Sequence, residues 1–231
     1  MTRKPNVETV PGDFQKTQLR SALQCSKLGI FTPWLDGAGT GSSSRYSVAQ
    51  QDSRAAAFVC VFAYGSLIWR PGFAFHSCQR ATLAGYRRAF RQASSDHRGT
   101  SARPGRVVTL VPEPGGAACV GLAYLLAAPA LDVLSALDHR ERAGYVRESV
   151  NVTLADGSIQ QAITWIAPPG NPHDAGELAL PALAELVAVA EGPSGRNDEY
   201  VLRLEQALRE LDGADPLVSE LCSRLRAARE S

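Results

Sequence analysis

The chain has 231 residues, of which 45% are apolar and 20% are charged, and its formal net charge is +1. This composition is typical of a globular protein with a sizeable core, and so weak a net charge gives no reason to expect nucleic acid or an anionic membrane as a partner. No apolar run approaches the ~18 residues that span a bilayer. No hydrophobic signal segment follows Met1.

The five cysteines are scattered and form no C-x-x-C pair, and the four histidines show no metal-ligand spacing. We therefore expect neither a zinc site nor a disulfide framework. Reduced thiols are typical of the cytoplasm, which is the expected location of the protein.

Residues 1–57 differ in composition from the rest of the chain. They carry seven basic against four acidic residues, and they include the run 37–44, which is rich in glycine and serine like a flexible linker. A transit peptide or an artefact of the start site would also fit, although the acidic residues argue against a transit peptide. We expect 1–57 to be a poorly ordered leader or extension and 58–231 to form the globular domain.

The globular region begins with an uninterrupted apolar run, 58–63, which predicts a strand buried on both faces. The run stops at Gly65-Ser66, where the backbone turns. Its freed N–H groups can then converge on an anion or on a polarised carbonyl.

Two further strands are predicted at 106–111 and 118–125, with Gly115 and a second glycine between them, so we expect them to form a hairpin. Leucines every three residues then predict a short helix that is entered through Pro129.

A second hairpin is predicted where polar and apolar residues alternate up to Asp156-Gly157, a strong turn signal. Its two strands cover residues 150–154 and 159–166.

The last third of the chain changes to a helical period. Gly192 ends the first helix, Asn197 is a candidate N-cap of the second, and Asp215 followed by proline opens the third. The mixture predicts an α+β fold, with a mostly antiparallel sheet or small barrel and with helices concentrated toward the C-terminus. The three helical patterns cover residues 180–190, 201–211 and 217–225.

One carboxylate stands out as a candidate for acid–base chemistry. Glu141 lies where the short helix ends and Gly144 redirects the chain. It could belong to a surface run of salt bridges. Alternatively it turns inward, where burial would raise its pKa from ~4.3 toward that of a useful general base, with Tyr145 beside it.

Two arginines, Arg98 and Arg106, belong to a loop that leads into a strand. They could bind a carboxylate, because a guanidinium group pairs with both of its oxygens, or they could be exposed or held in structural ion pairs. Ser66 lacks the G-x-S-x-G context of a hydrolase nucleophile, so the chain offers neither an obvious nucleophile nor a metal.

Four segments together resemble the ChaC-like γ-glutamylcyclotransferases, a family that acts on glutathione. They follow one another in the family's order across residues 58–211. Two mild departures are Ala63, where relatives often have glycine, and Ala143, where a glycine or a polar residue is common. The matching segments are Phe62–Phe73, Ser95–Gly99 with Pro104–Val107, Leu137–Tyr145, and Gly192–Tyr200.

The resemblance implies a γ-glutamylcyclotransferase-like fold, a small mixed β-barrel with flanking helices. It implies that Glu141 is the catalytic acid/base and that Tyr145, Arg98 and Arg106 lie at or near the pocket, and it implies no cofactor. The loop implied to hold the γ-glutamyl group consists of Ala63, Tyr64, Gly65, Ser66, Leu67 and Ile68.

The resemblance also implies the reaction. The α-amine of the substrate would attack its own γ-carbonyl, and glutathione would give 5-oxoproline and Cys-Gly. Two alternatives stay open, namely cyclotransfer on other γ-glutamyl amines or amino acids, and a non-catalytic regulator that binds small molecules. The sequence does not predict the oligomeric state.

Overall fold

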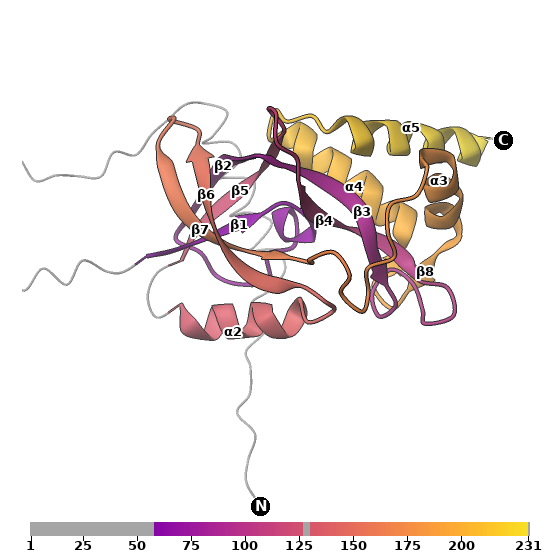
Figure 1. Ribbon diagram of the computed structural model, residues 1–231, viewed down its shortest axis with the longest axis horizontal. Coiled ribbons are helices and arrows are strands. Elements are labelled where there is room, and N and C mark those ends of the chain that lie inside the picture. Colours follow the sequence, from indigo (N-terminus) through magenta and orange to yellow (C-terminus); the bar gives the residue numbers. More distant parts are fainter. Residues whose placement is uncertain (1–57, 127–129, 231) are drawn as a thin grey trace, which may run out of the picture. The chain divides into compact units, whose positions relative to one another are not determined.

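The computed structural model describes residues 58–126 and 130–230 (Figure 1). The predicted leader at 1–57 and the predicted helix entrance at Pro129 lie outside the described residues.

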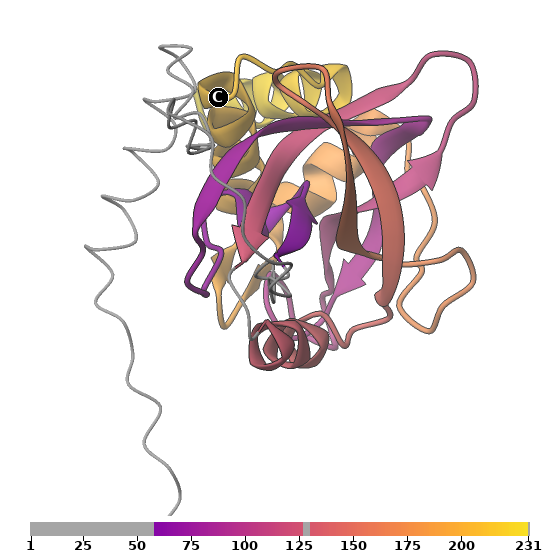
Figure 2. The ribbon, with the colours of Figure 1, turned by 90° about the vertical axis from the view of Figure 1, so that its left-hand side faces the viewer.

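Five strands close a barrel in the order β1-β5-β2-β6-β7. Strand β1 runs antiparallel to β5 and parallel to β7, so the barrel is mixed, as predicted. Figure 2 shows these strands curving around a common interior. The barrel strands are β1 (Val59–Ala63), β2 (Ser77–Ala84), β5 (Ala118–Leu126), β6 (Val146–Leu154) and β7 (Ile159–Ile166).

Two strands, β3 (Tyr86–Ser94) and β4 (Gly105–Pro112), pair with each other in a separate sheet. The predicted hairpin between β4 and β5 is therefore wrong. Only Gly85, with a φ of 76°, separates β2 from β3, so these strands follow each other as one bent ribbon. Strand β4 pairs with the second half of that ribbon and β5 with the first half, because a turn signal reverses the chain without fixing which strands become partners.

The second predicted hairpin is confirmed, since β6 and β7 pair antiparallel across the turn at 155–158. All four predicted helices are present, and the last three pack together beside the β3–β4 sheet (Figure 1). No helix in the described part of the chain is long and apolar enough to cross a membrane. The helices are α2 (Leu131–Arg140), α3 (Leu180–Val189), α4 (Asn197–Glu210) and α5 (Pro216–Glu230).

The two predicted helix starts have different outcomes. Asp215 caps α5, because its Oδ1 accepts a hydrogen bond from the Val218 N–H at 3.2 Å. The N-cap position of α4 is Arg196, and Asn197 is the first helical residue. The Asn197 amide is instead bonded to the backbone of β4, where tertiary contacts outweigh local capping.

Three glycines allow the loop after β3 to pass close to the segment that precedes α4. A Cβ atom on Gly99 would lie 2.1 Å from the Gly105 nitrogen, and one on Gly192 would lie 2.4 Å from the Gly99 oxygen. Real Cβ atoms do not approach backbone atoms so closely, so this crossing requires glycine.

The crossing predicts a large loss of stability for Gly192→Ala. The comparison variant is Gly157→Ala, because Gly157 has a φ of 86° with no atom within 4 Å of an added Cβ. We expect Gly157→Ala to cost ~1–2 kcal/mol from backbone strain alone. Gly192→Ala should cost about 3 kcal/mol or more, because the backbone atoms of the two crossing segments must move apart to make room for the added Cβ. Urea unfolding measures both, and equal costs would contradict the close crossing.

Candidate active site

A cavity of ≈ 130 Å³ lies where the end of β1, the end of α2 and strands β3 and β4 meet. Most of the residues singled out in the sequence line it. The lining residues among them are Ala63, Tyr64, Gly65, Ser66, Leu67, Arg98, Glu141 and Tyr145.

Two of the expected residues do not line this cavity. Ile68 is buried, and its carbonyl oxygen accepts a hydrogen bond from the Tyr124 hydroxyl at 3.1 Å. Arg106 is also buried, and no described residue accepts a hydrogen bond from its Nε. The binding roles given to these two residues remain predictions.

The loop after β1 turns three consecutive carbonyl groups into the protein. The Tyr64 oxygen accepts from Arg88 Nε at 2.8 Å, the Gly65 oxygen from the Ile68 N–H at 3.0 Å. The Ser66 oxygen accepts from the Arg70 N–H at 2.9 Å. Each fixes the peptide group that follows, because the C=O and N–H of a trans peptide point in opposite directions.

The N–H groups of Gly65, Ser66 and Leu67 therefore face away from those partners. No described residue accepts a hydrogen bond from them, and all three residues line the cavity. Leu67 lies in the short 3-10 helix η1 (Ser66–Ile68), whose first N–H groups have no partner within the helix. The loop can therefore offer several donors to a carboxylate or to a developing oxyanion.

A buried arginine connects this loop to β5 and to the start of α5. The Arg88 side chain is 1% exposed and pairs with Asp215, with 3.1 Å between Nη1 and Oδ2. It also donates to the Val120 carbonyl oxygen. Arg88 thus connects the loop to β5 and to the N-cap of α5, which leaves the Tyr64 peptide little freedom.

Glu141 follows the last residue of α2 and turns into the cavity, as the second of the two interpretations expects. Its Oε1 lies 3.3 Å from Arg140 Nε. Burial raises the pKa of the Glu141 carboxyl above its usual value, against the opposing charges of Arg140 and His97. A carboxylate in this state is better suited to accept a proton than an exposed one.

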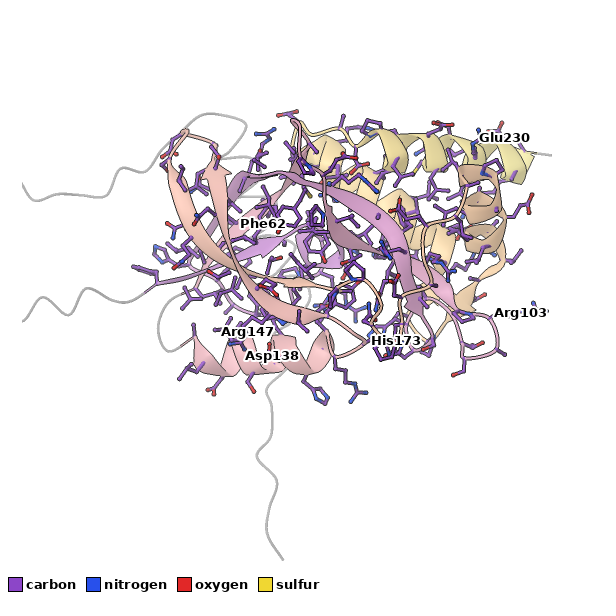
Figure 3. The ribbon with its side chains drawn as sticks, viewed as in Figure 1. Phe62, Arg103, Asp138, Arg147, His173 and Glu230 are labelled. Atoms are coloured by element: carbon purple, nitrogen blue, oxygen red, sulfur yellow. The ribbon has the colours of Figure 1, made fainter. Side chains whose placement is uncertain are left out.

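Helix α2, which carries Glu141, is fixed to the barrel through Asp138. This carboxylate accepts a hydrogen bond from Trp165 Nε1 at 2.9 Å and pairs with Arg147 on β6. The Asp138–Arg147 pair lies between α2 and the barrel (Figure 3).

Arg140 ties the end of α2 to the loop. Its Nη2 donates to Ser66 Oγ at 3.0 Å and its Nη1 to the Arg70 carbonyl oxygen at 2.9 Å. Arg140 was not predicted to have a role, because a charged residue in the run 138–142 is usually exposed. Its position directly before Glu141 was the available signal.

The segment after Glu141 is held by a pair of amide side chains. Gln92 Nε2 donates to the Ala143 carbonyl oxygen at 2.7 Å, and the Gln92 and Asn171 amides bond to each other in both directions at 3.0 Å. Gly144 has a φ of 86°, which favours glycine, and a Cβ there would displace the Asn171 amide, because it would lie 2.2 Å from Oδ1. This pair was not predicted, since nothing in the sequence relates residues so far apart.

The free edge of β4 forms part of the cavity wall, and side chains replace a neighbouring strand there. The Asn197 amide bonds to both the N–H and the carbonyl of Arg106, at 2.6 and 2.8 Å. Tyr145 donates to the Val108 oxygen at 2.7 Å, while Tyr200 accepts from the Val108 N–H at 3.4 Å. This edge places both tyrosines in the cavity.

The cavity is lined by charged residues of both signs, namely Arg70, Arg98 and Arg140 with Asp96 and Glu141. Arg98 is also held in an ion pair, with 3.2 Å between its Nη1 and Glu199 Oε2. Among residues 58–126 and 130–230, no group of three His, Cys, Asp or Glu side chains could hold a metal ion.

Comparison with known proteins adds four findings. A family model described as "ChaC-like protein" matches residues 59–228. "Gamma-glutamylcyclotransferase 2-3" of Arabidopsis thaliana is 36% identical over 72% of this chain and 87% of its own length. "Glutathione-specific gamma-glutamylcyclotransferase" of Escherichia coli is 34% identical over 71% of each chain. The crystal structure of a yeast γ-glutamylcyclotransferase specific to glutathione superimposes with a TM-score of 0.69 at 27% identity, covering 74% of this chain and 96% of that one.

Proposed function

The chain belongs to the family of ChaC-like proteins, and we propose that it is a γ-glutamylcyclotransferase that converts glutathione into 5-oxoproline and Cys-Gly. One observation carries the proposal, namely that the Glu141 carboxylate and the unpaired N–H groups of the Gly65–Leu67 loop share one cavity. The names of the E. coli and yeast relatives support glutathione as the substrate.

This reaction needs no protein nucleophile, because the substrate supplies its own. The α-amine nitrogen adds to the γ-carbonyl carbon and closes a five-membered ring, and the bond from that carbon to the cysteine nitrogen then breaks. Well-placed intramolecular groups reach effective molarities of ~10⁵–10⁸ M, so a cavity that folds the γ-glutamyl group correctly removes much of the barrier.

Glu141 manages the protons of this sequence. An α-amine has a pKa of about 8 and is largely protonated at neutral pH, so it must lose a proton before it can attack. Glu141 accepts that proton and returns one to the departing cysteine nitrogen, first as base and then as acid. The loop N–H groups hold the α-carboxylate or the oxyanion that forms on the γ-carbonyl.

One lining arginine could pair with a carboxylate of this substrate. Glutathione carries two carboxylates and one ammonium group, a net charge of about −1 at neutral pH. Arg98 pairs with Glu199 and Arg140 with Glu141, whereas Arg70 has no acidic partner among the described residues.

The pH dependence of kcat follows from the raised pKa of Glu141. The carboxyl must be ionised to act as base, so kcat should fall as the pH drops through that pKa, at a pH above 4.5. A pH profile of kcat at saturating glutathione measures this. A kcat that stays constant down to pH 4.5 would contradict the role of Glu141.

Mass spectrometry of reduced glutathione incubated with the purified protein tests the proposed function. We expect 5-oxoproline and Cys-Gly in equal amounts. Free glutamate would mean hydrolysis and would contradict cyclisation. Cleavage of other γ-glutamyl amines alone would move the specificity away from glutathione, and no cleavage of either would favour the non-catalytic regulator.

A further inference from the structure

Three tyrosines, Tyr64, Tyr145 and Tyr200, line the same cavity as Glu141. Two of them already donate their hydroxyl protons to backbone carbonyl groups. Tyr64 donates to the Trp165 carbonyl oxygen at 2.6 Å, and Tyr145 donates to that of Val108.

The Tyr200 hydroxyl differs, because its oxygen is an acceptor. It receives the Val108 N–H, and no described residue accepts the proton of Tyr200 itself. A tyrosine hydroxyl can accept and donate at once, so this donor remains available to a ligand.

The Tyr200 hydroxyl also lies beside the loop. A Cβ built on Gly65 would be 3.5 Å from this oxygen, and Tyr200 lines the cavity while being only 4% exposed. Its ring packs edge-on against Trp69 with 5.5 Å between centroids, and the Arg98 guanidinium carbon is 5.8 Å from the ring centroid. These contacts fix the hydroxyl before any substrate arrives.

Ring closure decides where the negative charge appears. The nitrogen that Glu141 deprotonates bonds to the carbon that carries the oxyanion, so this oxygen forms close to Glu141. A donor for it must lie near both Glu141 and the loop. Tyr200 lines the same cavity as Glu141, its oxygen lies beside Gly65 of the loop, and no described residue accepts its proton.

We propose that the Tyr200 hydroxyl donates a hydrogen bond to the γ-carbonyl oxygen of the substrate as that oxygen becomes an oxyanion, so that Tyr200 is a further catalytic residue. This inference rests on the proposed function. When the amine nitrogen adds, the π electrons of the carbonyl move to the oxygen. When the bond to the cysteine nitrogen breaks, they return, and the proton stays on Tyr200 throughout.

The acid–base state of the hydroxyl agrees with this role. Burial raises the pKa of Tyr200 to about 12. The group is therefore protonated at neutral pH and remains a donor, and proton transfer is left to Glu141.

The first test compares Tyr200→Phe with Tyr145→Phe, because each removes one hydroxyl bonded to Val108 from the same cavity. We expect kcat for glutathione to fall by ~10²–10³-fold in Tyr200→Phe with little change in KM. Tyr145→Phe loses only a structural bond and should lose less than about tenfold. Equal losses, or a kcat within threefold of the parent's in Tyr200→Phe, would overturn the proposal.

Two further readouts separate this role from others. In a Glu141→Gln background, calorimetric Kd values for reduced glutathione should agree within about threefold with and without Tyr200→Phe, since the oxyanion is absent from the ground state. A loss of binding as large as the loss of kcat/KM would overturn the proposal. A shift of the acid limb of the kcat pH profile by about one unit or more in Tyr200→Phe would also overturn it. Such a shift would mean that Tyr200 acts by changing the pKa of Glu141.

Circular-dichroism melting checks the fold of each variant. If Tyr200→Phe does not fold, 3-fluorotyrosine at position 200 retains the bulk and makes the hydroxyl a stronger donor. Its kcat should be equal or higher, and a tenfold fall would overturn the proposal. An inactive parent protein would remove the proposed function and this inference together, whereas an active parent with an equally active Tyr200→Phe removes this inference alone.

Discussion

Glu141→Gln should lower the turnover of glutathione by about 10³–10⁴-fold, the upper part of the range for loss of a general acid or base. Glutamine keeps the shape of the side chain and can neither accept nor return the proton of the substrate amine. Measurement of 5-oxoproline at saturating glutathione gives the effect on kcat. Glu148→Gln is the matched control, because Glu148 is exposed on β6 and does not line the cavity, and it should retain full activity.

The same substitution should leave the protein at least as stable at neutral pH. A raised carboxyl pKa means that the folded state binds the proton more tightly than the unfolded chain does, so ionised Glu141 destabilises the fold. The penalty is absent below the unfolded pKa and fully present above the folded one. Removing the charge should not lower the melting temperature at pH 7. A marked fall in Tm together with lost activity would point to unfolding, and substantial activity in Glu141→Gln would contradict its assignment as the base.

Arg88→Met should lower the free energy of unfolding by ~3–5 kcal/mol, because it leaves Asp215 as an uncompensated, mostly buried charge. The Tyr64 carbonyl oxygen also loses its donor. That donor fixes the Tyr64–Gly65 peptide group, which contains the Gly65 N–H of the loop. The kcat should therefore fall even at temperatures where the variant is folded.

The neighbouring residue provides the control. Arg87 is 33% exposed and pairs with Glu113 and Glu177, which are themselves 51% and 42% exposed. Exposed pairs contribute ~0–1 kcal/mol, so Arg87→Met should change stability by less than that and leave activity unchanged. Urea unfolding and glutathione turnover compare the two variants. Similar results for both would mean that Arg88 does not anchor the loop.

The elements that the sequence predicts correctly are those with a local signal. The apolar run of β1, the Asp156-Gly157 turn and the leucine spacing of the C-terminal helices each depend on neighbouring residues. Pairing of β4 depends on residues far away in the chain, so the predicted hairpin failed. Strand β3 escaped prediction because Arg88 interrupts its apolar pattern, although Asp215 allows this arginine to be buried.

The residues of the candidate site likewise divide into those with a local sequence signal and those without one. The Tyr64–Leu67 loop and Glu141 have recognisable local sequences, and they were predicted on that basis. Arg140 and Tyr200 lie within two of the matching segments, but their contacts, respectively with the Ser66 hydroxyl and with the edge of β4, depend on what the fold places beside them. No spacing in the sequence predicts that the Tyr200 hydroxyl proton has no acceptor among the described residues.

The side chains that complete the edge of β4 have a consequence for the growing chain. The sequence separation between Arg106 and Asn197 is 91 residues, and at ~5–20 residues per second synthesis takes roughly 5–18 s to cover it. During that interval the Arg106 N–H and carbonyl and the Val108 N–H lack these partners, so this edge of β4 can pair with the same strand of another nascent copy. A product that terminates before α4 should therefore aggregate, and the last third of the chain protects the first two thirds during biosynthesis.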